Sequence, residues 1–196
     1  MFVEAPKNFE ITRDIDFTLF GMGPKYRRRA ERMQPQDRVL FYIERVRKWP
    51  ASATIISTYF EDNSPLWHPI TKNESFQYRV KLKPDIVLDE EDYIDAMILA
   101  PRLDYVKRWA PENWPLAFWD RLHLLPQRDF RLIEGEMERI ASRKGKLKFD
   151  LTSEQSADFD IENEIGPDRD HAQDEEDIPS SSQPSDEGAT GDRTAG

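Results

Sequence analysis

Cysteine is absent from the 196-residue chain, so neither a disulfide nor a cysteine-ligated metal site can form. Histidine is scarce, with three residues, and no apolar run approaches the roughly 18–20 residues that span a bilayer. The first residues, 1–6, lack the basic and then apolar pattern of a signal peptide. We therefore expect a soluble cytoplasmic protein, and we expect no cofactor and no bound metal.

The formal charge of −10 is unevenly distributed along the chain. Residues 150–196 contain 15 Asp/Glu and two Lys/Arg, a net charge of −13, whereas residues 1–149, with 26 Lys/Arg and 23 Asp/Glu, carry +3. Of the 22 aromatic residues, only Phe159 follows residue 149. A segment with so little apolar surface cannot offset the entropy of ordering itself. The sequence thus predicts a folded basic domain at 1–149 and a disordered acidic tail at 150–196.

The acidic tail has two possible roles. A segment tethered to a basic surface can occupy that surface as a polyanion mimic, because the tether keeps its local concentration high. The alternative, a solubilising appendage, is the simpler interpretation of such a composition, and the sequence favours it somewhat.

Residue patterns in the first 149 residues predict an α+β domain. The clearest pattern is at 76–83, where Phe76, Tyr78, Val80 and Leu82 alternate with polar residues, as in a strand with one apolar face, and Pro84 follows. Further strands are expected at 17–20, 38–45 and 53–58, and helices at 8–14, 25–33 and 129–143. Residues 89–120 should form short helical turns interrupted by prolines.

Few residues in the chain suggest catalysis. His68 and His123 lie 55 positions apart, without the close spacing of a local zinc motif, and no glycine-rich phosphate loop is present. The acidic run at 89–92 could hold a cation, but such runs more often form the solvated start of a helix. These observations favour a non-catalytic protein.

Basic residues are concentrated at 25–48, which contain nine Lys/Arg against three Asp/Glu. Arg28 and Arg32 are four residues apart, and Lys25 precedes Arg28 by three, so a helix would place them on one face. Such a stripe can contact successive phosphates, and neutralising phosphates releases counterions. The alternative is an ordinary solvated helix face. The predicted phosphate-contacting residues are Lys25, Arg27, Arg28, Arg29 and Arg32.

Three segments in a fixed order resemble the EVE domain family of the PUA-like superfamily, which is related to YTH and ASCH domains. The first is APKNFE at 5–10, similar to the opening that follows the first strand in EVE domains. The second runs from Phe20 and Gly21 through the basic residues to MQPQDRVLFY at 33–42, and the third is YRVKLKP at 78–84. Together they cover about residues 1–141.

The resemblance implies a PUA-like curved β-barrel with flanking short helices. It also implies a pocket with aromatic walls that accommodates one base, often a modified one, of DNA or RNA, and a nuclease or modification enzyme acting in trans. The residues that the resemblance and the aromatic pattern assign to this base-binding pocket are Asn8, Phe9, Phe20, Gly21, Tyr42, Trp67 and Arg79.

The sequence differs from the family pattern at several positions, and alternatives stay open. Phe9 and Phe20 stand where many relatives have Trp, and Gln36 replaces the usual glycine of the turn. The aromatic residues could simply pack the core, and Arg79 could pair with an acid such as Glu61. A second functional hypothesis is a hydrolase of modified nucleosides on the same fold, with His123 or Asp120 as its reactive group.

Overall fold

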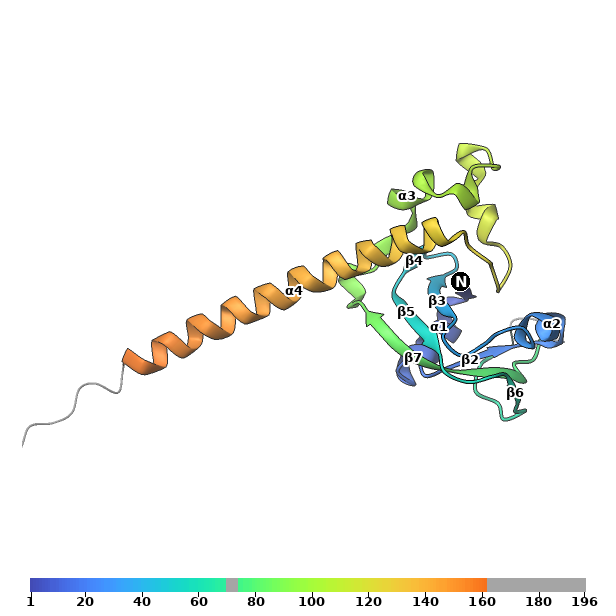
Figure 1. The fold of residues 1–196 in the computed structure, drawn as a ribbon, viewed down its shortest axis with the longest axis horizontal. Helices are drawn as coiled ribbons and strands as arrows, with labels where there is room; N and C mark the ends of the chain where they lie inside the picture. Colours follow the sequence, from blue (N-terminus) through green and yellow to red (C-terminus); the bar gives the residue numbers. More distant parts are fainter. Residues whose placement is uncertain (70–73, 162–196) are drawn as a thin grey trace, which may run out of the picture. The chain divides into compact units, whose positions relative to one another are not determined.

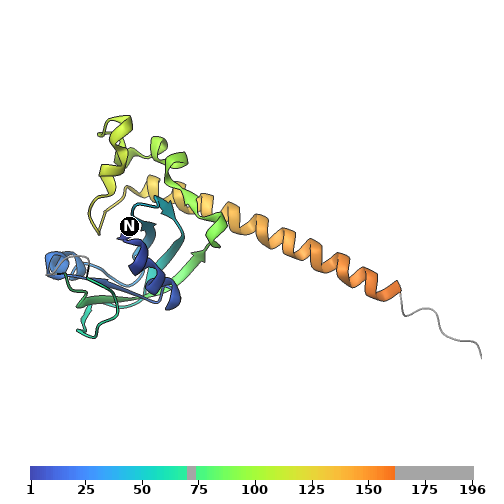
Figure 2. The same cartoon turned by 180° about the vertical axis from the view of Figure 1, so that it is seen from behind.

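The computed structural model describes residues 1–69 and 74–161 (Figures 1 and 2). The chain divides into two compact units, Met1–Glu154 and Gln155–Gly196. The first unit contains the sheet, the core and all three cavities discussed here. Residues 162–196, which make up most of the predicted acidic tail, lie outside the described residues.

Eight strands form one mixed and mostly antiparallel sheet, in the order β2-β7-β5-β3-β4-β8. β1 pairs with β3 in parallel, and β6 pairs with β7. No described pairing joins β2 to β8, so the sheet is open; the α+β class is confirmed, and the barrel is not. The strands are β1 (Phe2–Glu4), β2 (Leu19–Met22), β3 (Arg38–Ile43), β4 (Lys48–Trp49), β5 (Ala51–Ile55), β6 (Phe60–Glu61), β7 (Tyr78–Val87) and β8 (Ile94–Asp95).

β7 continues past Pro84, where the sequence predicted its end. Pro84 lies opposite Ala53 of β5, and the pairing between the two strands shifts register between Ser52 and Ala53. Proline cannot donate a ladder hydrogen bond, and such an irregularity is one of the few places in a sheet that accommodates it. The predicted alternation is confirmed upstream, since Tyr78, Val80 and Leu82 are all buried.

The helices differ from the prediction mainly in length. The basic helix expected at 25–33 is a 3₁₀ turn followed by a four-residue α-helix, and the last helix extends well beyond 129–143. No proline interrupts the chain between Pro126 and Pro167. The last helix therefore continues past residue 150, where the acidic tail was expected to begin. The α-helices are α1 (Pro6–Asp14), α2 (Arg27–Ala30), α3 (Ala96–Leu99) and α4 (Gln127–Ile161).

Residues 89–120 form the predicted short helical turns, together with β8, a strand that the sequence did not predict. The 3₁₀ helices are η1 (Pro24–Tyr26), η2 (Glu90–Asp92), η3 (Ala100–Arg102), η4 (Asp104–Val106) and η5 (Pro111–Phe118). None of the described helices combines the length and the apolar character needed to cross a membrane.

The core is rich in stacked and edge-on aromatic rings. Phe2 of β1 stacks on Phe20 of β2 with ring centroids 3.8 Å apart, and Phe41 of β3 packs edge-on against both. α4 contributes Ile133 and Met137, which are fully buried. Rings packed in this way bury large apolar areas and gain additional attraction from their edge-to-face geometry.

The start of α4 joins residues 89–120, called here the irregular segment, to the sheet (Figure 1). The Asp129 carboxylate accepts hydrogen bonds from the backbone N–H groups of Asp104 and Tyr105, at 2.9 and 2.7 Å. One turn further on, Glu134 pairs with Arg38 of β3. We call residues 25–37, which precede β3, the basic segment. These contacts hold η4 close to it, and the candidate site lies between the two.

Candidate nucleic-acid interface

The aromatic residues predicted to wall a pocket lie in the core instead. Phe9, Phe20 and Tyr42 are buried, and none of them lines one of the cavities found among the described residues. Phe20 stacks on Phe2, and the Tyr42 ring packs against Trp49 and Phe118. The described residues therefore do not form a pocket walled by these three rings.

The other four predicted pocket residues gather around the loop that follows β6. The Asn8 side chain exchanges two 2.9 Å hydrogen bonds with the backbone of His68, and Trp67 donates through Nε1 to Thr12 Oγ1 at 2.9 Å. The Trp67 ring packs against Gly21 on one side and lies within cation–π distance of Arg79. Asn8 also lines a cavity of about 680 Å³, but both ends of its amide are already bonded.

Arg79 is buried, with 2% of its surface exposed. Its Nη1 pairs with Asp62 at 2.5 Å and donates to Ser64 Oγ at 2.9 Å, and its Nε donates to the backbone oxygen of Phe76. Arg79 thus forms an ion pair, the second of the alternatives left open for it, and its partner is Asp62 rather than Glu61. Arg79 holds the loop in place.

The predicted phosphate-contacting residues do not lie together. Arg29 and Arg32 line a cavity of about 720 Å³, and Lys25 lines a neighbouring cavity of about 480 Å³. Arg27 pairs with Glu31 at 2.9 Å, one turn along the helix. Arg28 is exposed and lines none of the three cavities. The basic segment therefore contributes to two adjacent cavities instead of forming one continuous stripe.

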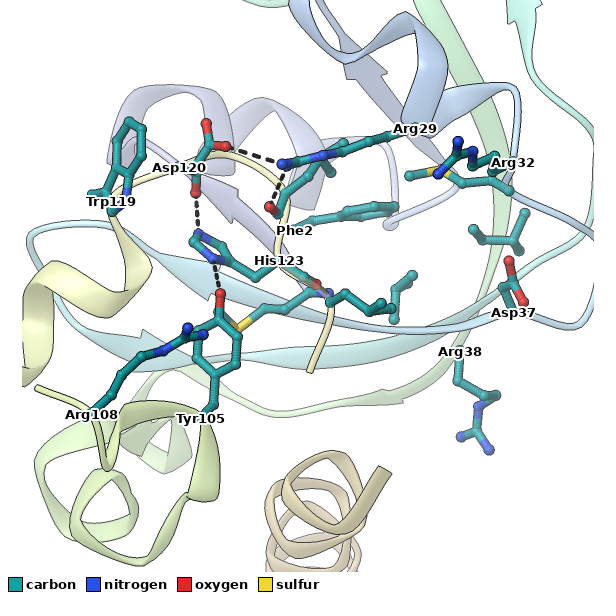
Figure 3. A pocket seen from close by; sticks show the side chains of 16 residues that line it. Phe2, Arg29, Arg32, Asp37, Arg38, Tyr105, Arg108, Trp119, Asp120 and His123 are labelled. Atoms are coloured by element: carbon teal, nitrogen blue, oxygen red, sulfur yellow. Dashed lines mark hydrogen bonds and ion pairs between the residues drawn. The ribbon is translucent and has the colours of Figure 1, made fainter. Parts of the chain in front are cut away.

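We call the 720 Å³ cavity the arginine cavity (Figure 3). Its walls come from the basic segment, from the first residue of β3 and from the irregular segment around η4 and η5, which lie far apart in the sequence. Four arginines, two aspartates, a histidine and a tyrosine line it. The labelled residues are Phe2, Arg29, Arg32, Asp37, Arg38, Tyr105, Arg108, Trp119, Asp120 and His123.

His123 is held at both ring nitrogens. Nε2 lies 2.6 Å from the backbone oxygen of Asp120, which can only accept, so Nε2 donates and Nδ1 accepts from the Tyr105 hydroxyl at 2.9 Å. Burial lowers the pKa of His123 below its usual range, since the charged imidazolium is poorly solvated there. A neutral histidine with both nitrogens engaged serves to position the segment around it.

Asp120 joins the basic segment to the segment that follows η5. Lys25 binds its Oδ1 at 3.1 Å, Arg29 binds its Oδ2 at 3.3 Å, and the Tyr26 hydroxyl donates to Oδ1. Burial alone would raise the pKa of Asp120, but the hydrogen bonds from Tyr26 and Lys25 outweigh it and lower the pKa. Asp120 is therefore an ionised anchor for the two cations.

Trp119 and Arg108 were not identified from the sequence, although both line the arginine cavity. The Trp119 side chain is 68% exposed, and the Arg108 guanidinium lies 5.6 Å from the centre of the Tyr105 ring. Both residues belong to the part of the chain around 89–120, whose residue pattern indicated only short turns. Their proximity to the basic segment depends on tertiary contacts, so no local signal could have revealed it.

The acidic run at 89–92 is engaged by a lysine. Lys144 of α4 places its ammonium group 2.5 Å from Asp89 and 2.8 Å from both Glu91 and Asp92. These hydrogen bonds raise the pKa of Lys144 above its usual range. The run fixes α4 to η2, which agrees with a structural role for these acids.

Comparison with known proteins identifies the fold. No family model matches the chain, and no curated protein matches it. Among solved structures, it is similar to the YTH domain-containing protein mmi1 in complex with RNA, at 12% identity and a TM-score of 0.51, over 74% of this chain and 85% of that one. It is also similar to the YTH domain of Zygosaccharomyces rouxii MRB1 in complex with N6-methyladenosine RNA. That match has 14% identity and a TM-score of 0.47, over 68% and 83% of the two chains. The mmi1 match shows that the fold is YTH-like, and the comparisons do not single out the EVE branch.

Proposed function

We propose that the domain binds single-stranded nucleic acid, RNA first of all, and that it holds a base at the arginine cavity. The observation that carries the proposal is the cavity itself: Arg29, Arg32, Arg38 and Arg108 line a space of about 720 Å³ beside an exposed tryptophan. A cavity of this volume is within the range of small-molecule sites, and a base and its sugar are small enough to enter one.

The charges of the cavity suit a phosphate backbone. Arg29 and Arg38 are partly neutralised by Asp120 and Glu134, whereas Arg32 makes no ion pair with any described residue. Arg108 is exposed and lies within cation–π distance of the Tyr105 ring. Arg32 and Arg108 are thus the cations best placed to exchange their counterions for phosphates.

An exposed aromatic ring supports base recognition. Trp119 presents an indole that a base can stack on, at a value of roughly 1–3 kcal/mol. The fold agrees with this use, because the similar mmi1 domain was solved with RNA. A preference for a modified base is the finer part of the proposal and derives from the EVE resemblance. Since Phe9 and Phe20 lie in the core, we propose Trp119 as the residue on which this base stacks.

The hydrolase hypothesis is weaker on this geometry. Asp120 and His123 both line the arginine cavity, as a catalytic pair would. However, the Asp120 carboxylate is bound by Lys25 and Arg29, and both His123 nitrogens are hydrogen-bonded. Neither group is free to exchange a proton with a substrate, so binding is the function we propose.

The test is a titration of the full chain against labelled single-stranded RNA and DNA of matched sequence, with and without base modifications. We expect binding that weakens steeply with salt. The double variant Arg32→Ala/Arg108→Ala should weaken binding at least tenfold at low salt and flatten the salt dependence, because two phosphate contacts are lost.

The control is Arg139→Ala, which removes a cation from α4 outside the three cavities. It should bind like the wild type. Equal affinity of the double variant and the wild type would contradict the proposed site. Equal affinity for modified and unmodified oligonucleotides would leave a general nucleic-acid binder.

A further inference from the structure

The arginine cavity has an immediate neighbour. The cavity of about 480 Å³, called here the second cavity, shares Trp119 and Asp120 with it, so these two residues form the wall between the two spaces. Lys25 on one side and Arg29 on the other both bind the Asp120 carboxylate. A nucleic-acid chain with one base in the arginine cavity would therefore pass Lys25 and Arg29 on its way to the second cavity.

Arg121 lines the second cavity with half of its guanidinium unused. Its Nη1 pairs with Glu74 at 2.8 Å, and its face lies 4.7 Å from the centre of the Phe76 ring. Nε and Nη2 are buried, and no described residue accepts a hydrogen bond from either. Buried donors without acceptors are costly, and in native proteins they point to a missing partner.

We propose that the second cavity binds a nucleobase, with Arg121 reading two adjacent acceptors of the base. This inference rests on the proposed function and adds a base preference to it. The Nε–Nη2 edge of a guanidinium is a planar fork that fits two neighbouring acceptors. Guanine offers such a pair in O6 and N7, and cytosine in O2 and N3.

Adenine and uracil lack two adjacent acceptors: N1 and N7 of adenine are separated by the N6 amino donor, and O2 and O4 of uracil by the N3–H donor. The second cavity should therefore prefer guanine or cytosine. Since Nε and Nη2 are covered in the structure, a base reaches them only when part of the cavity wall shifts. Phe76 covers the guanidinium face and Glu74 holds Nη1, so the Nε–Nη2 edge is the part of Arg121 without a hydrogen-bond partner among the described residues.

The experiment measures fluorescence anisotropy of the full chain with four labelled RNA octamers. One is octauridylate, and the others carry a single guanine, cytosine or adenine at a central position. We expect the guanine or the cytosine octamer, or both, to bind about tenfold more tightly than the adenine octamer and octauridylate, as one bidentate contact provides. Arg121→Lys keeps the charge but removes the fork, so the guanine and cytosine octamers should bind it no more tightly than octauridylate does.

A second variant tests the cavity itself in case Arg121→Lys does not fold. Pro24 is exposed and lines the second cavity, so Pro24→Trp should fill its mouth and abolish the preference too. Arg139→Ala should keep it. Equal binding of all four octamers, or a preference that survives both Arg121→Lys and Pro24→Trp, overturns the inference and leaves the proposed function intact. Failure of every octamer to bind removes the proposed function, and the inference with it.

Discussion

The Trp67 indole lies against Gly21 so closely that a β-carbon at residue 21 would be 2.7 Å from its Cε3. The same β-carbon would be 2.9 Å from Cβ of Phe76. Trp67 cannot move away easily, because it is buried and its Nε1 donates to Thr12. Glycine at this position therefore allows the loop after β6 to pack on β2.

Gly21→Ala should destabilise the protein by about 1–3 kcal/mol, the usual cost of overpacking. Urea unfolding followed by circular dichroism measures the change. Gly135→Ala in α4 is the matched control, since its β-carbon would meet nothing within 4 Å. Alanine is the better helix former by roughly 1 kcal/mol, so this control should be slightly more stable than the wild type. A Gly21→Ala protein as stable as the wild type would contradict the described packing.

Gln36 adopts a left-handed backbone conformation, with φ at 79°. A left-handed backbone costs a residue with a β-carbon roughly 1–2 kcal/mol. Glycine avoids this cost but loses more conformational entropy on folding, so its net gain is smaller. Gln36→Gly should therefore stabilise the protein, by up to about 1 kcal/mol. Thermal unfolding measures it, and Gln34→Gly in the same turn should give no gain because residue 34 has no positive φ. A loss of stability in both variants would show that the turn gains nothing from glycine.

Much of the fold could be predicted because its signals are local. The alternation at 78–82 predicts the strand β7, and the prolines of the irregular segment predict its short turns. Each signal depends only on residues close together in the sequence. Gln36 illustrates the same point: EVE domains, which this segment resembles, usually have glycine there, and the structure shows a positive φ at Gln36.

The site was less predictable, because it depends on which aromatic and basic residues meet. A buried phenylalanine and a pocket phenylalanine look alike in sequence, and only the stacking of Phe20 on Phe2 distinguishes them. Arg108 and Trp119 reach the basic segment through tertiary contacts, among them the Asp129 carboxylate that bonds the backbone of η4. Contacts between segments so far apart leave no periodic trace in the chain.

Because Glu4 is buried, it should make the free energy of unfolding depend on pH, and Glu4→Gln should isolate its contribution. Burial raises the pKa of Glu4 to about 8, against the opposing effects of the Thr12 hydrogen bond and the Arg121 charge. An unfolded glutamate ionises near pH 4.3. Between about pH 4.5 and 8 the folded protein thus keeps a proton that the unfolded chain has released, and the contribution of Glu4 to stability falls as pH rises.

The Met1 amine acts in the opposite direction, because burial lowers its pKa to about 5. The clear measurement is therefore the difference between Glu4→Gln and the wild type. Glutamine keeps the acceptor for Thr12 and cannot ionise, so the variant should gain stability relative to the wild type from pH 5 to pH 8. Glu10→Gln, exposed on α1, controls for the lost charge. A difference that stays constant over this range would show that Glu4 is ionised in the folded protein.

Trp119 should contribute to nucleic-acid affinity without contributing to its salt dependence. The residue is 68% exposed and borders both cavities, and Lys25 Nζ lies 5.2 Å from the centre of its ring. Loss of one stacked base at roughly 1–3 kcal/mol corresponds to a decrease of about 5- to 150-fold in affinity for Trp119→Ala. The slope against salt should stay unchanged, because no cation is removed.

Trp119→Phe should recover part of the affinity, since a smaller ring still stacks. The control is Ile98→Ala on α3, which removes a 70% exposed apolar side chain that lines none of the three cavities. It should bind RNA like the wild type. If Trp119→Ala binds normally while Arg32→Ala/Arg108→Ala does not, the cavity contacts phosphates alone, and the base lies elsewhere.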